Sequence, residues 1–184
     1  MKLIDEPIEG LKLLELPRFD DVRGSFVKTF HQGLFQQLGI EFTPREDFHS
    51  VSRAGVLRGL HFQAPPADHA KLVSCPHGRV LDVVLDLRKS APSYGRFFSC
   101  ELSATNHRAL FMPSGFAHGF LALDDQSLVT YSVTSVHSPA HDSGIRWDSF
   151  GFRWPIATPI LSTRDAAFVG FGEFSSPFEA CPPS

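Results

Sequence analysis

Residues 55–63 read Gly-Val-Leu-Arg-Gly-Leu-His-Phe-Gln, and residues 113–120 read Pro-Ser-Gly-Phe-Ala-His-Gly-Phe. Each stretch sets apolar residues between glycines, which is typical of a short strand in the wall of a β-barrel. Each also carries one histidine, His61 or His118, on a strand whose side chains can point into the interior. The two stretches therefore predict a barrel with both histidines in a shared cavity. The surrounding residues decide between a metal site and acid–base chemistry.

Short strand-like segments fill most of the chain, separated by Gly, Pro, Asn and Asp. Residues 80–87 are β-branched and mostly apolar, as expected of a strand covered on both faces. Only residues 32–38 predict a short helix. Strands at this spacing without helical crossovers predict an all-β jelly-roll barrel with a few short helices. The other expected strands are residues 11–16, 24–30, 56–62, 71–75, 97–102, 109–112, 119–123 and 128–133.

The length of 184 residues, with no repeat and no linker, predicts a single domain over residues 1–184. From about residue 168 the composition becomes that of an irregular tail. Four phenylalanines there have near-helical spacing, but two glycines and a proline disfavour a stable helix. We expect these rings to dock on the barrel or on a neighbouring subunit.

Composition and charge exclude several classes of partner. A net charge of −3 without a basic stripe argues against nucleic-acid binding. Cys75, Cys100 and Cys181 are odd in number and lack metal-ligand spacing, so we expect reduced thiols in a cytoplasmic protein. The first residues become charged too early for a signal peptide, and no apolar run approaches the length of a membrane helix.

The metal alternative depends on the neighbours of the two histidines. A metal-binding barrel usually presents two histidines one residue apart, a carboxylate soon after, and a third histidine on a later strand. His118 suits the third position, but the partner position of His61 is Gln63, a poor ligand, and Asp68 falls in a turn. Lys71 adds a positive charge where a divalent cation would sit. We therefore expect no metal.

Four basic side chains are expected around this cavity: Arg58, His61, Lys71 and His118. Each alone would be read as an ordinary polar residue near a strand end. Together they are costly to bury unless they meet an anionic ligand. Phosphate is the natural candidate.

The motifs that carry a family resemblance are residues 19–24, 55–63, 71–75, 78–88, 93–95, 102–106, 113–120, 131, 145–147, 154–155 and 161–165. In these motifs the chain resembles the dTDP-4-dehydrorhamnose 3,5-epimerase family of nucleotide-sugar epimerases. The resemblance implies a cupin-like jelly roll and a homodimer whose N-terminal strands reach into the partner's site. It also implies catalysis without a metal or organic cofactor on a nucleotide-diphosphate 4-keto-6-deoxy sugar.

The resemblance assigns roles for inversion at C3 and C5, where a 4-keto group makes the protons weakly acidic. His61 matches the base, Asp165 the carboxylate that orients it, Tyr131 the opposing acid, and Lys71 the cation beside the enolate oxygen. Further expected substrate-binding residues are Arg23, Arg58, Gln63, His118 and Arg164.

The chain departs from the family pattern at residues expected to recognise the substrate. Glu46 and Phe48 stand where the family usually has Gln and Asn, Lys28 where it has Glu, His137 where it has Tyr, and Asp142 where it has Glu. A lysine suits the N3 acceptor of cytosine, whereas a carboxylate suits the N3–H donor of thymine. A CDP-sugar substrate and inversion at one carbon alone are therefore alternatives. We count all of these positions as substrate-binding: Lys28, Glu46, Asp47, Phe48, His137 and Asp142.

Two other classes of function stay open at this stage. One is a metal-dependent cupin oxygenase or isomerase that uses His61, Asp68 and His118. The other is a non-catalytic sugar-nucleotide binding module. The joint presence of His61, Tyr131, Lys71 and Asp165 argues against the module, because binding alone needs no acid and base on opposite faces.

Overall fold

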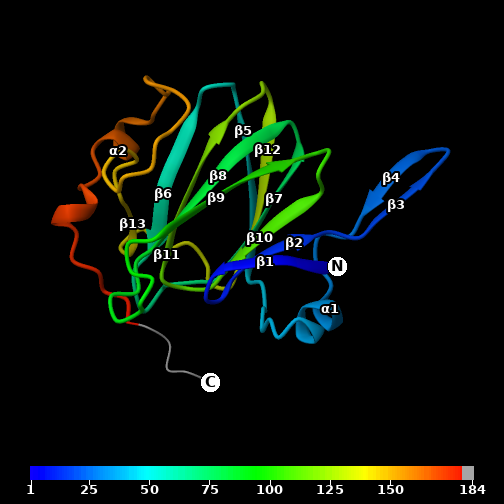
Figure 1. Cartoon of the computed structure of the whole chain (residues 1–184), viewed down its shortest axis with the longest axis horizontal. Coiled ribbons are helices and arrows are strands. Elements are labelled where there is room, and N and C mark those ends of the chain that lie inside the picture. The colour runs from blue at the N-terminus through cyan, green and yellow to red at the C-terminus, as the bar shows by residue number, and fades with distance from the viewer. Residues whose placement is uncertain (180–184) are drawn as a thin grey trace.

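The computed structural model describes residues 1–179, with two antiparallel sheets that form the walls of a barrel (Figure 1). The first sheet has the order β1-β2-β10-β7-β12-β5, with bounds Lys2–Ile8, Leu11–Glu15, Arg108–Met112, Lys71–His77, Ser127–Val133 and Glu46–Ser52. The second has the order β13-β6-β11-β8-β9, with bounds Asp142–Gly144, Leu57–Gln63, Phe116–Ala122, Arg79–Asp86 and Phe97–Ser103. The predicted jelly-roll fold class is confirmed. Cys181 and the end of the predicted tail lie outside the described residues.

The remaining elements are short. β3 (Arg18–Asp21) and β4 (Gly24–Val27) form a separate hairpin that projects from the barrel (Figure 1). The helical segments are α1 (Gln32–Gln37), α2 (Thr163–Ala166) and the 3₁₀ turn η1 (Phe171–Glu173). Within residues 1–179, no helix has the length and apolar character needed to cross a membrane.

Most predicted strands are present, with bounds that differ by a few residues. Strand β8 is buried on both faces, as its sequence predicts, because the other sheet covers its inner face and the segment after β13 covers its outer face. The apolar core between the sheets includes Leu11, Val84, Leu102 and Leu110, all fully buried. Each large apolar side chain buried in this way stabilises the fold by about 1.5–3 kcal/mol.

The strands that sequence patterning missed are the more exposed ones. Strand β5 reads Glu-Asp-Phe-His-Ser-Val-Ser and lies at an edge of its sheet, so few of its residues need to be apolar. Strands β1 and β3 are also mostly exposed. β13 has only three residues, too few for any periodicity.

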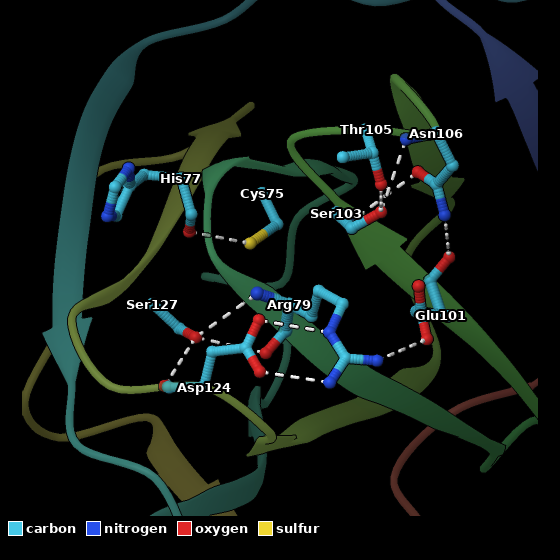
Figure 2. A network of polar contacts seen from close by, with 9 residues as sticks. All are labelled: Cys75, His77, Arg79, Glu101, Ser103, Thr105, Asn106, Asp124 and Ser127. Carbon is cyan, nitrogen blue, oxygen red and sulfur yellow. Dashed lines mark hydrogen bonds and ion pairs between the residues drawn. The ribbon is translucent and has the colours of Figure 1, made fainter.

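A polar network closes one end of the barrel, where β7 ends and β8 and β12 begin (Figure 2). The Arg79 guanidinium pairs with Asp124, at 3.0 Å, and with Glu101, at 3.6 Å. Ser127 Oγ donates to Asp124 O, and Cys75 Sγ donates to His77 O. Cys75 is buried, and burial raises the pKa of its thiol to about 11. Cys75 is therefore a structural residue.

The chain after β13 runs along the outside of the second sheet (Figure 1). Phe174 and Phe178 both pack edge-on against Phe62 of β6, with ring centroids 5.4 and 5.5 Å apart. The expectation that the tail docks on the barrel is confirmed for these two rings. Apart from η1, the segment from 168 to 179 has no helix or strand, as its glycines and proline predict.

Two glycines let β6 and β11 approach closely enough to bring the two histidines together. Gly59 has φ of +122°, and a Cβ added there would lie 2.5 Å from the Cα of Gly119. In the pairing of these strands His61 lies directly opposite His118. The glycines in the opening stretches are thus steric requirements of the shared cavity.

We expect Gly59→Ala to lower the free energy of unfolding by about 2 kcal/mol or more, because the new methyl group meets backbone and φ is left-handed. Urea unfolding measures the change. Gly172→Ala is the matched control: its Cβ would meet nothing within 4 Å, and we expect a change below about 0.5 kcal/mol. Equal stability of the two variants would contradict the steric argument.

Candidate active site

A cavity of about 270 Å³ opens between the two sheets and contains both histidines among its lining residues. Strands β6 and β11 supply His61 and His118 from one sheet. Strands β7 and β12 supply Lys71 and Tyr131 from the other. The predicted shared cavity is therefore present, and a ligand bound in it would lie between groups from opposite walls.

His61 is held by a buried carboxylate. Its Nε2 lies 2.9 Å from Asp165 Oδ1, and the Asp165 side chain is only 6% exposed. Asp165 Oδ2 accepts a hydrogen bond from Gly59 N at 3.0 Å. Burial by itself raises the pKa of Asp165, but bonds from His61, Gly59 and Ser162 hold this pKa below its usual value.

An ionised Asp165 can only accept hydrogen bonds, so Nε2 of His61 carries the proton in the neutral imidazole. The second ring nitrogen, Nδ1, is then the basic one. It makes no hydrogen bond to any group within residues 1–179, and the side chain is 32% exposed on the cavity wall. This arrangement suits a general base.

His118 belongs to a second, deeper pair. Its Nε2 lies 2.8 Å from Asp82 Oδ2, with both side chains almost completely buried. Asp82 Oδ1 has no hydrogen-bond partner within the described part of the chain. Asp82 therefore places a negative charge beside Lys71 and Tyr131, and the pKa of both groups reflects it.

Tyr131 and Lys71 supply an acid and a cation on the wall opposite His61. Burial raises the pKa of Tyr131, so its phenol stays protonated at neutral pH. Its ring stacks on Phe48 at 4.7 Å with an interplanar angle of 14°. Lys71 is 8% exposed and its Nζ donates to His61 O at 3.2 Å. Burial lowers the Lys71 pKa to about 8, which keeps most of it charged at neutral pH.

The structure brings together most of the other predicted residues at the mouth of this cavity. Glu46 accepts a hydrogen bond from His137 N at 2.6 Å, and Asp142 pairs with Arg164 at 2.8 Å. The other predicted residues that line the cavity are Phe48, Arg58 and Gln63.

Three predicted residues lie outside the cavity. Arg23 is in the turn of the projecting hairpin, where it pairs with Asp21, and Lys28 follows the hairpin, with its Nζ 5.9 Å from the centre of the Phe19 ring. Asp47 is on the opposite face of β5 and accepts a hydrogen bond from Ser132 Oγ. Neither Arg23 nor Lys28 reaches the cavity of its own chain, so any role there requires a second subunit.

Sequence reasoning missed several residues of the site. Asp82 interrupts an apolar strand, and a carboxylate at such a position is a signal for a buried partner. His69 also lines the cavity, and burial, with the charges of Lys71 and His137, lowers its pKa to about 3. The contact of Phe168 with His61, at 5.7 Å between ring centroids, had no sequence signal.

The residues considered for a metal are engaged otherwise. Gln63 Nε2 donates to Ala67 O at 2.8 Å, and its Oε1 accepts from Ser138 N at 2.6 Å. Asp68 accepts a hydrogen bond from Ser114 Oγ. Within residues 1–179, no group of three His, Cys, Asp or Glu side chains is arranged to hold a metal ion.

A barrel cavity with a carboxylate-held imidazole on one wall and a buried phenol and ammonium on the other has the groups that proton transfer at a carbon acid needs. The family model described as dTDP-4-dehydrorhamnose 3,5-epimerase matches residues 5–173. The chain belongs to this family.

Individual relatives agree with that assignment. The dTDP-4-dehydrorhamnose 3,5-epimerase of Shigella flexneri is 40% identical over 170 residues, which cover 90% of this chain and 93% of the relative. The crystal structure of the Bacillus anthracis enzyme of the same name, with TDP and PPi bound, has a TM-score of 0.90 and 38% identity, and the match covers 92% of this chain and 99% of that one. A 3,5-epimerase from Legionella pneumophila, in complex with dTDP-4-keto-L-rhamnose, has a TM-score of 0.92 and 32% identity over 98% and 99% of the chains.

The buried charge of Lys71 should destabilise the fold at neutral pH. Its pKa is about 8 in the folded protein against 10.5 ordinarily, so the penalty is fully present below pH 8 and disappears as pH rises through 10.5. We expect Lys71→Met to raise the free energy of unfolding at pH 7 by about 1–3 kcal/mol, and by much less near pH 10.5. Urea unfolding at both pH values measures this.

Lys89→Met serves as the control, because Lys89 is about half exposed and paired only with Glu179 at the surface. We expect it to change stability by less than about 0.5 kcal/mol at either pH. A Lys71→Met variant less stable than the native protein at pH 7 would show that the ammonium is a net stabilising group.

Proposed function

We propose that this protein inverts C3, C5 or both in a dTDP-linked 4-keto-6-deoxy hexose, through an enolate and without a metal or organic cofactor, in deoxysugar biosynthesis. The observation that carries the proposal is the His61–Asp165 pair on one wall of the cavity, with Tyr131 and Lys71 on the other. Relatives named as 3,5-epimerases and binding TDP or a dTDP-4-keto sugar support the substrate class.

Proton removal falls to His61. The ketone at C4 acidifies the hydrogens on the adjacent carbons, and Nδ1 of His61 takes one of them while the electron pair moves to the ketone oxygen. The resulting imidazolium is stabilised by the ionised Asp165 at its other nitrogen. Asp165 keeps its charge throughout, which agrees with its lowered pKa.

Lys71 and Tyr131 complete the reaction. The ammonium stabilises the negative oxygen of the enolate, and a buried cation is more effective there than one in water. The phenol of Tyr131 then delivers a proton to the carbon from the face opposite His61, which inverts the centre. General acid–base groups placed in this way contribute about 10²–10⁴-fold each to the rate.

We further propose a homodimer in which the β3–β4 hairpin of each subunit completes the partner's cavity. Phe19 and Phe26 on this hairpin are 57% and 62% exposed, and Val22 at its tip is fully exposed. Apolar side chains on a projecting hairpin favour burial against another chain. In that arrangement Arg23 would meet the substrate diphosphate and Lys28 the nucleobase.

Because residue 28 is a lysine, a CDP-sugar remains the alternative substrate. The Lys28 ammonium can donate a hydrogen bond to N3 of cytosine, but it cannot accept one from N3–H of thymine.

Cys75 and Cys100, both free thiols, support a reducing, cytoplasmic location.

In the test of the reaction, the enzyme is incubated in deuterium oxide with dTDP- or CDP-4-keto-6-deoxyglucose, and deuterium is read at C3 and C5. We expect incorporation with the native protein, and a loss of about 10³-fold or more in His61→Ala, because the base is removed. His77→Ala, on an exposed histidine at the other end of β7, is the control and should be fully active.

Exchange that survives in a folded His61→Ala variant would disprove the role of His61 as the base. Incorporation at one carbon only would define a monoepimerase. Tighter competition by dTDP than by CDP would rule out the cytosine hypothesis for Lys28.

Mixed dimers test the shared site. Arg23→Glu and His61→Ala chains are each expected to be nearly inactive, but a dimer of one of each has one site with both native residues. Random mixing should then restore about a quarter of native activity. A mixture of His61→Ala and Tyr131→Phe chains, both altered in the same barrel, should stay inactive. Failure of the first mixture to regain activity would mean that each site is built from one chain.

A further inference from the structure

We propose that Phe168 is a positioning residue that fixes the imidazole of His61 for proton transfer. The inference rests on the proposed role of His61 as the base. The two rings meet edge to face, with centroids 5.7 Å apart and planes inclined at 77°. Such aromatic pairs stabilise a structure beyond the effect of the apolar area that they bury, and they prefer particular angles.

A single turn of chain supplies both groups that hold His61. Asp165 lies in the one-turn helix α2, and Phe168 follows three residues later, just beyond the C-cap Ala167. Residues three apart on a helical turn lie on one side of it. Asp165 therefore fixes the ring at Nε2, while Phe168 packs on the ring itself, and rotation of the imidazole would break both contacts.

Strand β13 leaves room for the Phe168 ring. Gly144 pairs directly with His61 across β13 and β6. A Cβ at Gly144 would lie 2.3 Å from Cε2 of Phe168. The Phe168 ring thus occupies the space that a side chain at Gly144, opposite His61, would fill.

Other contacts hold Phe168 in that space. The guanidinium carbon of Arg164 lies 5.4 Å from the centre of the ring, and Asp142 holds Arg164 by an ion pair of 2.8 Å. The next residue along the chain is anchored by Arg146 N, which donates to Val169 O at 2.9 Å. A ring fixed on this many sides can restrict its neighbour, which a loosely held ring cannot do.

The consequence for catalysis concerns orientation. Proton transfer requires Nδ1 within about 3–3.5 Å of the reacting atom and correctly aimed, and small misplacements cost large factors in rate. Among residues 1–179, loss of the Phe168 ring leaves Asp165 as the one side chain whose contact orients the imidazole. Arg164 stays paired with Asp142 when the ring is lost, so the substrate's nucleotide should bind as before, and the turnover number should fall while KM changes little.

The experiment compares Phe168→Leu with Phe171→Leu. Both remove a ring from the same segment, but Phe171 packs on Tyr94, at 5.4 Å, and not on His61. We expect kcat for C3 or C5 exchange to fall about 10-fold in Phe168→Leu, with KM within about twofold, and to change little in Phe171→Leu. Phe168→Tyr, which keeps the ring, should restore most of kcat.

A second measurement reports the contact itself. The carbon-bound protons of the His61 ring, followed by NMR, should shift in Phe168→Leu and not in Phe171→Leu, because only Phe168 lies beside them. This measurement needs no activity. Should Phe168→Leu fail to fold, Phe168→Met, which keeps the apolar volume, replaces it in both measurements.

The proposal is overturned if kcat of the ringless variant equals that of the native protein, if the loss appears in KM instead, or if the Phe171 control loses as much. It is also overturned if the His61 resonances do not move. A native protein without any exchange activity would instead refute the proposed function, so the two failures are distinguishable.

Discussion

The carboxylate of Asp165 is the interaction on which the site depends. One oxygen holds His61 and the other accepts the backbone N–H of Gly59, two residues earlier on the same strand. The same carboxylate therefore ties the C-terminal segment to β6 and sets the tautomer of the His61 imidazole. Because Asp165 is buried, loss of its partners would leave an unpaired charge, which costs several kcal/mol. Asp165 thus both positions the His61 imidazole and holds the C-terminal segment against β6.

The order of the two sheets explains why a base and an acid can face each other. A jelly roll builds its walls from strands distant in sequence, and β6 and β12 are separated by five other strands along the chain. Their inward side chains must approach from opposite sides of whatever lies between the walls. With the proposed roles, a planar enolate held there would meet His61 on one face and Tyr131 on the other, so inversion would follow from the architecture as much as from the residues.

Sequence patterning identified the buried strands well because burial imposes apolar, β-branched residues, as in β8. It missed β5 and β13, which are held by pairing with one neighbour and carry polar side chains. The shared cavity of the two histidines was predictable from two glycine-flanked stretches. The Asp165–His61 bond was not, since 104 residues separate its partners, and it entered only through family resemblance. A single chain cannot show the substrate-binding roles expected of Arg23 and Lys28, because neither side chain reaches the cavity of its own barrel.

The charged groups buried at the site lower the stability of the fold. Lys71, Asp82 and Asp165 lie within one barrel, where an apolar side chain would pack at lower cost. Asp82 even keeps one oxygen without a hydrogen-bond partner among residues 1–179. The cost is reduced because the charges of Asp82 and Lys71 are of opposite sign, and because Asp165 accepts hydrogen bonds from His61 and Gly59. Burial lowers the Lys71 pKa to about 8, close to its point of deprotonation, although the charges of Asp142 and Asp82 oppose this shift. Because Lys71 is buried and its Nζ donates to His61 O, the ammonium would already be oriented when an enolate oxygen forms, and its burial would provide this pre-organisation.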